Sequence, residues 1–148
     1  MDHLQEYIEA MQAELRSKAA HFYGDDFARA AVGACVLIAA SDGAISHDER
    51  QRISGFMGHA VVLKQFDISQ LRSYFDYFCN SLASDYHMTK SEVIQLMGQL
   101  SDRPEQAVAA LQLAIIVATS DRVVSQREKD TLRELAAAAG VDPIGLGF

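Results

Sequence analysis

Two stretches of the chain repeat one spacing of hydroxyl and carboxylate side chains. In each, a Ser-Asp pair is followed by a serine four positions after the aspartate and a glutamate seven positions after it. These three residues are Asp42, Ser46 and Glu49 in the first stretch, and Asp121, Ser125 and Glu128 in the second. We call the two stretches the first and second acidic turns. Because carboxylate and hydroxyl oxygens are the hard ligands that Ca²⁺, Mg²⁺ and Mn²⁺ prefer, both turns are candidates for a divalent-cation site.

Helix initiation offers a simpler explanation for part of the pattern. The serine and glutamate of both turns match the S-x-x-E capping box, in which each side chain bonds a free backbone amide of the first helical turn. A serine in this position stabilises a helix by about 1 kcal/mol relative to alanine. The aspartates need a separate explanation. For Asp42 the structural alternative is an Asx-turn beside Gly43, which can adopt the positive φ of a tight reversal.

As a metal site, neither turn suffices alone. A single turn is shorter than the loop of about 12 residues that encircles Ca²⁺ in an EF-hand. A glutamate at a helix start also lies at the positive end of the helix dipole, where a cation is disfavoured unless several carboxylates outweigh it. We therefore expect a site only where both turns converge, with His47 either solvated or joining as a nitrogen ligand. The candidate metal ligands are Asp42, Ser46, Asp48, Glu49, Asp121 and Glu128.

The elements that carry these turns are predicted to be helices. Residues 30–40 and 107–118 are apolar nearly all round, which is typical of a central helix contacted from several sides. Each run precedes an acidic turn, and each is shorter than the ~20 residues that a membrane span needs. A duplicated helical hairpin would pack its copies about a pseudo-twofold axis, with these two helices at the centre. Both acidic turns would then lie at the same end of the bundle.

Amphipathic stripes at helical spacing fill the rest of the chain, and no stretch alternates with the period of a strand. We therefore expect an all-α, single-domain bundle of about seven helices over residues 1–148. Its parts are an amphipathic N-terminal helix within residues 1–24, ended near Gly24, and repeat halves at about 26–61 and 105–140.

Several residues are predicted to start or end these helices. Asp25 or Asp26 is expected to cap the second helix, and the T-K-S-E stretch at 89–92 reads as a capping box. Pro104 suits the first turn of the helix that follows it, because its missing amide proton would have no partner there. Gly140 is predicted to close the last long helix.

Charge and cysteine usage limit the partners and the compartment. A formal charge of −7 with no basic stripe argues against non-specific nucleic-acid binding and against polybasic docking on anionic lipid, and it favours cations or basic protein surfaces. Cys35 and Cys79 lie in apolar runs without metal-ligand spacing, so we expect two reduced, buried thiols. The first residues lack the basic and apolar regions of a secretory signal, which predicts a cytoplasmic protein without direct membrane insertion.

No motif for catalysis is present. The chain lacks HExxH, a P-loop, GxGxxG and G-x-S-x-G, and carboxylates at helix starts have their pKa lowered by the dipole, not raised as acid catalysis requires. A non-enzymatic role is therefore expected. The alternative to cation binding is a metal-free adaptor that contacts a partner protein through the acidic turns or through the apolar C-terminus, residues 144–148, which could equally pack on its own core.

Four features in this order resemble the TerB-like tellurite-resistance proteins. They are the first turn S-D-G-x-x-S-x-x-E, its echo at 120–128, L-K-Q-F-D at 63–67 and the ending G-V-D-P-I-G-L-G-F, and together they cover residues from about 27 to 148. The resemblance implies a soluble bacterial domain of about seven helices with an internal two-helix symmetry. Members are proposed to bind metal through the acidic turns.

The resemblance also implies a role in resistance to tellurite and in inhibition of phage and colicins, without enzymatic activity. It implies a multi-component system that includes membrane proteins of the TerC type. Such a partner would hold the chain in the cytoplasm or at the periphery of the inner membrane. The sequence leaves the oligomeric state open, a homodimer included.

The second acidic turn departs from the family pattern. Arg122 stands where the family usually has glycine, and Arg127 adds another positive charge near Asp121 and Glu128. A guanidinium that pairs with these carboxylates could take the place of a cation. The first turn, which keeps its glycine and its acids, is therefore the favoured half of the site.

Overall fold

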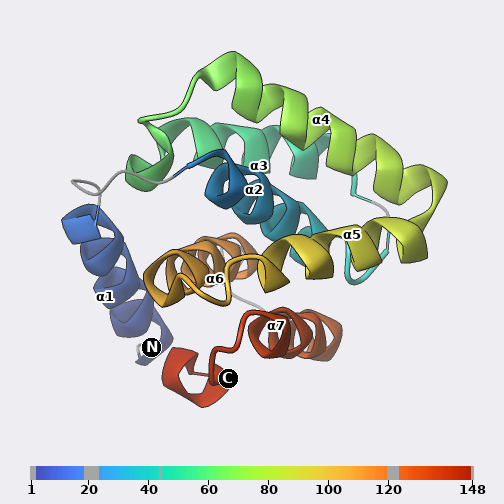
Figure 1. Cartoon of the computed structure of the whole chain (residues 1–148). Coiled ribbons are helices and arrows are strands. Elements are labelled where there is room, and N and C mark those ends of the chain that lie inside the picture. The colour runs from blue at the N-terminus through green and yellow to red at the C-terminus, as the bar shows by residue number, and fades with distance from the viewer. Residues whose placement is uncertain (1–2, 19–23, 44, 120–123, 148) are drawn as a thin grey trace.

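The computed structural model describes residues 3–18, 24–43, 45–119 and 124–147. Within these ranges the chain forms seven α-helices and two 3₁₀ helices, and no strand (Figure 1). They are α1 (His3–Lys18), α2 (Asp25–Ala39), α3 (His47–His59), η1 (Val61–Leu63), α4 (Ile68–Ser84), α5 (Tyr86–Gly98), α6 (Pro104–Ala118), α7 (Gln126–Ala138) and η2 (Pro143–Leu146). The all-α prediction is confirmed.

Helices α2 and α6 form the centre of the bundle. They share the most extensive helix contact, and nearly all their residues are buried because apolar side chains cover every face. Helices α4 and α5 pack on α2, while α7 packs on α5 and α6, so the two apolar runs are enclosed as expected (Figure 1). In the described part of the chain, no helix combines the length and the apolar character that crossing a bilayer requires.

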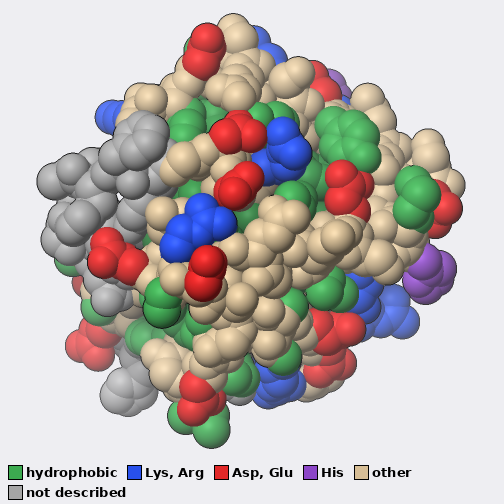
Figure 2. Space-filling view, viewed as in Figure 1, with side chains coloured by type: hydrophobic (Ala, Val, Ile, Leu, Met, Phe, Trp, Pro, Cys, Tyr) green, Lys and Arg blue, Asp and Glu red, His purple; other side chains and the backbone are tan. Residues whose placement is uncertain are grey.

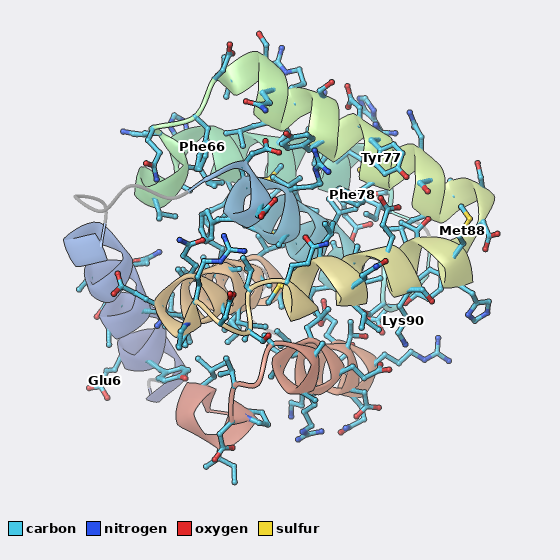
Figure 3. The ribbon with its side chains drawn as sticks, viewed as in Figure 1. Glu6, Phe66, Tyr77, Phe78, Met88 and Lys90 are labelled. Carbon is cyan, nitrogen blue, oxygen red and sulfur yellow. The ribbon has the colours of Figure 1, made fainter. Side chains whose placement is uncertain are left out.

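A glycine in α2 allows two neighbouring helices to approach closely. A Cβ atom at Gly33 would lie 3.1 Å from Cζ of Phe78 in α4 and 3.2 Å from Cγ2 of Val93 in α5. Phe78 points from α4 towards the interior of the bundle (Figure 3). Interiors are packed to crystal-like density, so a side chain at Gly33 would push these helices outwards. Small residues in α2 thus set the distance between the central helix and its neighbours.

Two predicted helix ends are confirmed. Pro104 lies in the first turn of α6. Gly140 follows α7 with a φ of 72°, and the amides of Val141 and Gly140 donate to the carbonyls of Ala136 and Ala137 over 2.8 and 3.2 Å. This pair of hydrogen bonds is the Schellman motif, which needs a residue in the left-handed conformation and therefore favours glycine.

The predicted cap at Asp25 or Asp26 is wrong. The N-cap of α2 is Gly24, which offers no side-chain bond, and both aspartates lie in the first turn. The Asp25 carboxylate instead accepts a hydrogen bond from Gln70 Nε2 of α4 over 2.8 Å and one from Arg29 over 3.2 Å. The helix therefore begins one residue earlier than a cap at Asp25 would place it. Aspartates are favoured anywhere in the first turn, because their negative charge interacts favourably with the helix dipole, so their presence there does not identify the cap.

The predicted capping box at 89–92 is also wrong. Helix α5 begins after Asp85, whose carboxylate accepts from the amide of Met88 over 3.1 Å. Thr89 lies inside the helix and is fully buried, and its hydroxyl donates to the carbonyl of Asp85 over 2.9 Å. Glu92 bonds the hydroxyl of Tyr77 in α4. An earlier aspartate therefore takes the capping role, because α4 ends only one residue before it.

The two ends of the described chain lie against the same side of the bundle. Helix α1 packs on η1 and α6 through Met11, which is buried. A Cβ atom at Gly147 would lie 2.9 Å from the ring of Tyr7. Leu146 is buried while Ile144 is 79% exposed, so part of the apolar C-terminus packs on the core of the protein. Phe148 lies outside the described residues. Helix α1 ends at Lys18, and the predicted continuation towards Gly24 also lies outside them.

Both cysteines are free and buried, as predicted. Burial raises the pKa of the Cys35 thiol to about 12 and that of Cys79 to about 11, because a thiolate loses its hydration inside the protein. The two thiols are therefore small apolar core groups at neutral pH.

Candidate functional site at the acidic turns

The serine and glutamate of each acidic turn form a complete capping box. Ser46 Oγ accepts from the amide of Glu49 over 3.1 Å, and the amide of Ser46 donates to Glu49 Oε1 over 2.9 Å. The second turn repeats both distances between Ser125 and Glu128. The local prediction for these four residues is confirmed, and the same bonds start α3 and α7.

The first turn lies against the start of α7. Ser125 Oγ donates to Asp42 Oδ1 over 2.9 Å, and Ser41 Oγ donates to Thr131 Oγ1 over 2.9 Å. Asp42 follows central helix α2, whereas Ser125 caps the helix that follows central helix α6. The two turns therefore meet at one end of the bundle, as the internal repeat predicted.

The described candidate carboxylates of the first turn differ in exposure. Asp42 and Asp48 are exposed, and Glu49 is half-buried. Gly43 has a φ of 133°, which agrees with its expected place in a tight reversal. Asp121 and Arg122 lie outside the described residues, so the expectation that Arg122 weakens the second turn stays a prediction.

The chemistry of the described donors fits a hard cation, but their number is small. Carboxylate and hydroxyl oxygens are of the class that Ca²⁺, Mg²⁺ and Mn²⁺ bind, and Ca²⁺ takes six to eight of them. Within the ranges that the structure describes, no three His, Cys, Asp or Glu side chains are grouped so as to hold a metal ion. One oxygen of Asp42 already accepts from Ser125. The described side chains therefore offer a partial ligand set.

Sequence reasoning missed two residues of this contact. Ser41 belongs to the repeated Ser-Asp pair, so its polarity at the end of a buried helix was a usable signal. Thr131 is buried on α7, and its hydroxyl also donates to the carbonyl of Arg127 over 2.9 Å. A threonine within a helix commonly bonds its own backbone in this way, so nothing local distinguished it.

Comparison with known proteins assigns a family to most of the chain. The family model "Tellurite resistance protein TerB" matches residues 28–146. The chain belongs to the TerB family. The matched range begins inside α2 and ends in η2, so it includes both acidic turns, most of α2 and all of α6.

A curated relative supports the assignment to the TerB family. The chain is similar to the tellurium resistance protein TerB from Alcaligenes sp, with 28% identity over 102 residues, which cover 69% of this chain and 84% of the relative. No solved structure matches the chain. Membership of the TerB family associates the chain with tellurite resistance.

Proposed function

We propose that this TerB-family chain contributes to tellurite resistance as a non-enzymatic binding protein. In this proposal, its acidic turns bind a divalent cation. The observation that carries the proposal is the hydrogen bond of 2.9 Å between Ser125 and Asp42, which joins the two turns. Neither turn has enough ligands alone, so a cation site requires them to meet.

In this proposal the first turn supplies most of the ligands. Asp42 and Asp48 are exposed carboxylates, with Asp48 in the first turn of α3, and Glu49 adds its second oxygen. Asp121 and Glu128 of the second turn complete the set, with Asp121 assigned from its place in the repeat. The bound ion would neutralise these acids and cross-link the ends of α2 and α7, and so would stabilise the bundle.

A metal-free adaptor is the second candidate, and a specific observation favours it. Glu49 and Glu128 each bond a helix amide, and Asp42 bonds Ser125, so these acids have structural partners without an ion. In that case the acidic turns serve helix initiation and present negative charge to a partner protein. Under either candidate, the partner we propose is a multi-component resistance system with a TerC-like membrane protein, which would bring the chain to the inner membrane.

Thermal unfolding and calorimetry with Ca²⁺, Mg²⁺ and Mn²⁺ separate the two candidates. A ligand that binds only the folded state at ~100 times its Kd stabilises it by about 2.7 kcal/mol. We expect one of these ions to raise the unfolding temperature of the parent chain. The effect should be lost in the double variant Asp42→Asn with Glu49→Gln, in which glutamine can still cap α3.

The matched control is Asp102→Asn with Glu105→Gln. This pair lies at the start of α6 and removes the same charge away from the acidic turns. If no ion at millimolar concentration changes the stability of the parent, or if the control loses the effect as well, the cation site is wrong and the metal-free adaptor replaces it. Loss of binding in Asp42→Asn but not in Asp121→Asn would locate the site in the first turn.

A further inference from the structure

A groove runs between α3 and α4, and His47 is the one residue of its lining that belongs to the first acidic turn. It has a volume of about 660 Å³, is open to solvent, and its lining comes only from these two helices. Helix α4 lies at the top of the view in Figure 1, with α3 behind it. The buried side chains of Met57, Leu71 and Phe75 form its floor, and Ile68 stands at its rim, 53% exposed.

The charge of the groove is opposite to that of the chain. Its lining includes His47, Arg50, His59 and Arg72, with Asp76 as the single acid, although the chain as a whole carries −7. On the face seen in Figure 2, by contrast, acidic and basic side chains are interspersed. A positive groove in an acidic protein is complementary to an acidic ligand.

The two arginines of the groove differ in their readiness to bind. Arg50 reaches across from α3 to Asp76 of α4 over 3.4 Å, and its guanidinium lies 5.8 Å from the ring centre of Phe75. Arg72 is exposed and has no ion-pair partner among the residues that the structure describes. An incoming carboxylate can therefore pair with Arg72 without breaking an existing bond.

Helix α3 carries glycines along the groove that its own fold does not require. Gly55 and Gly58 lie inside the helix without a positive φ, and a Cβ atom at either would meet no atom within 4 Å. A glycine inside a helix costs about 0.5 to 1 kcal/mol relative to alanine. Their effect is to leave the groove unfilled, so that another backbone can come close to α3.

We propose that the groove between α3 and α4 binds an acidic amphipathic helix of a partner protein. The apolar side chains of that helix would lie on the floor and against Ile68, and its carboxylates would pair with Arg72. The open shape favours a helix, because pockets for small molecules enclose most of their ligand. Helix-in-groove binding uses such a combination of apolar floor and charged rim.

Two helical peptides of opposite charge test the proposal. Each is stapled, is about 14 residues long to match the 13 residues of α3, and carries leucine at i, i+3, i+4 and i+7. One has glutamate at the flanking positions and the other has lysine. By fluorescence anisotropy we expect the glutamate peptide to bind at least about tenfold more tightly than the lysine peptide. Raising KCl from about 50 to about 300 mM should weaken this binding severalfold.

Variants of the full chain locate the binding site. Arg72→Glu reverses an exposed charge in the groove and should weaken the glutamate peptide at least about tenfold. The control, Arg52→Glu, makes the same charge change on α3 outside the lining and should have little effect. Gly55→Leu fills the groove and should abolish binding while circular dichroism and thermal stability show an intact fold. Its control, Ala137→Leu, adds the same side chain on the exposed face of α7.

Several results would overturn the proposal. They are the absence of saturable binding by the glutamate peptide, equal binding of the two peptides, or binding that survives both Arg72→Glu and Gly55→Leu. Binding of inorganic phosphate that depends on Arg72, without peptide binding, assigns the groove to a small anion instead. Self-association in sedimentation that Gly55→Leu removes assigns it to a second copy of the chain. None of the substituted residues lies in the acidic turns, so failure of this proposal can be distinguished from failure of the proposed cation site.

Discussion

At the scale of single residues, the hydroxyl of Ser125 has, among the described residues, one hydrogen-bond partner more than that of Ser46, its counterpart in the repeat. Its hydroxyl accepts from the amide of Glu128, as any capping serine does, and donates to the carboxylate of Asp42 from the other half of the chain. The first function belongs to α7 alone, whereas the second ties α7 to the end of α2. A single side chain thus links helix initiation to tertiary structure.

Replacing the two capping serines should therefore have unequal effects. Ser46→Ala removes a cap and should lower the free energy of unfolding by about 1 kcal/mol. Ser125→Ala also removes the bond to Asp42, and we expect a loss of about 2 kcal/mol in total. Urea denaturation measures both. In the double variant Ser125→Ala with Asp42→Asn the losses should be less than additive, since both changes remove one bond. Equal losses for the two serines would contradict this link.

The buried thiol of Cys35 should make stability depend on pH in the alkaline range. Its pKa rises from 9.0 to about 12 on folding, so the unfolded chain releases the proton first. This contribution to stability is complete below pH 9 and is lost as the pH rises towards 12. The slope is at most about 1.4 kcal/mol per pH unit. Denaturation between pH 8 and 10.5 should show a steeper decline for the parent than for Cys35→Ala, and identical slopes would refute the expectation.

At the scale of helices, glycine has opposite roles in α2 and α3. Gly33 permits α4 and α5 to contact the central helix, with side-chain atoms of Phe78 and Val93 lying 3.1 to 3.3 Å from the position that a Cβ atom would take. Gly55 has no neighbour at that position and borders the groove between α3 and α4. The same residue type therefore serves packing in one helix and an open surface in the other.

Alanine substitutions at these glycines should change stability in opposite directions. Gly55→Ala should raise the free energy of unfolding by about 0.5 to 1 kcal/mol, because it removes the cost of a glycine inside a helix. Gly33→Ala receives the same local gain but crowds Phe78 and Val93, and overpacking of a core costs about 1 to 3 kcal/mol, so a net loss is expected. Thermal and urea unfolding provide the measurement. A higher free energy of unfolding for Gly33→Ala would contradict this expectation, because it would mean that α4 and α5 can shift outwards at little cost.

At the scale of the whole molecule, the first helix is part of the bundle although the family match starts after it. The match covers residues 28–146, while α1 ends at Lys18 and packs on α6 and η1. Met11 is 3% exposed, and Tyr7 contacts Gly147 near the other end of the described chain. These contacts predict one cooperative unit that includes α1.

Removing the anchor of α1 should destabilise the entire bundle. Met11→Ala should lower the free energy of unfolding by about 2 to 3 kcal/mol, at the lower end for buried methionine, because α1 lies at the edge of the core. Circular dichroism and the fluorescence of the tyrosines should report a single transition with the same midpoint. Two separate transitions would show that α1 unfolds on its own, and the single-domain prediction would then be wrong.

Much of the fold and half of the site were predictable because they depend on local patterns. The apolar runs predicted α2 and α6 as the central pair, and the S-x-x-E pattern predicted both capping boxes with their bonds. Errors arose where two local signals competed. Sequence reasoning placed the start of α5 at Thr89, whereas Asp85 caps the helix, because α4 ends at Ser84.

The sequence by itself determined the helices, the central pair, the capped turns and the likeness to the TerB family. These follow from hydrophobic period and from contacts between residues three or four positions apart. Only the tertiary structure decided that Asp42 meets Ser125, that Ser41 meets Thr131, and that α3 and α4 leave a positive groove between them. The physical reason is that such features depend on how helices far apart in the chain pack against each other. A local sequence pattern carries no information on the spatial distance between those helices.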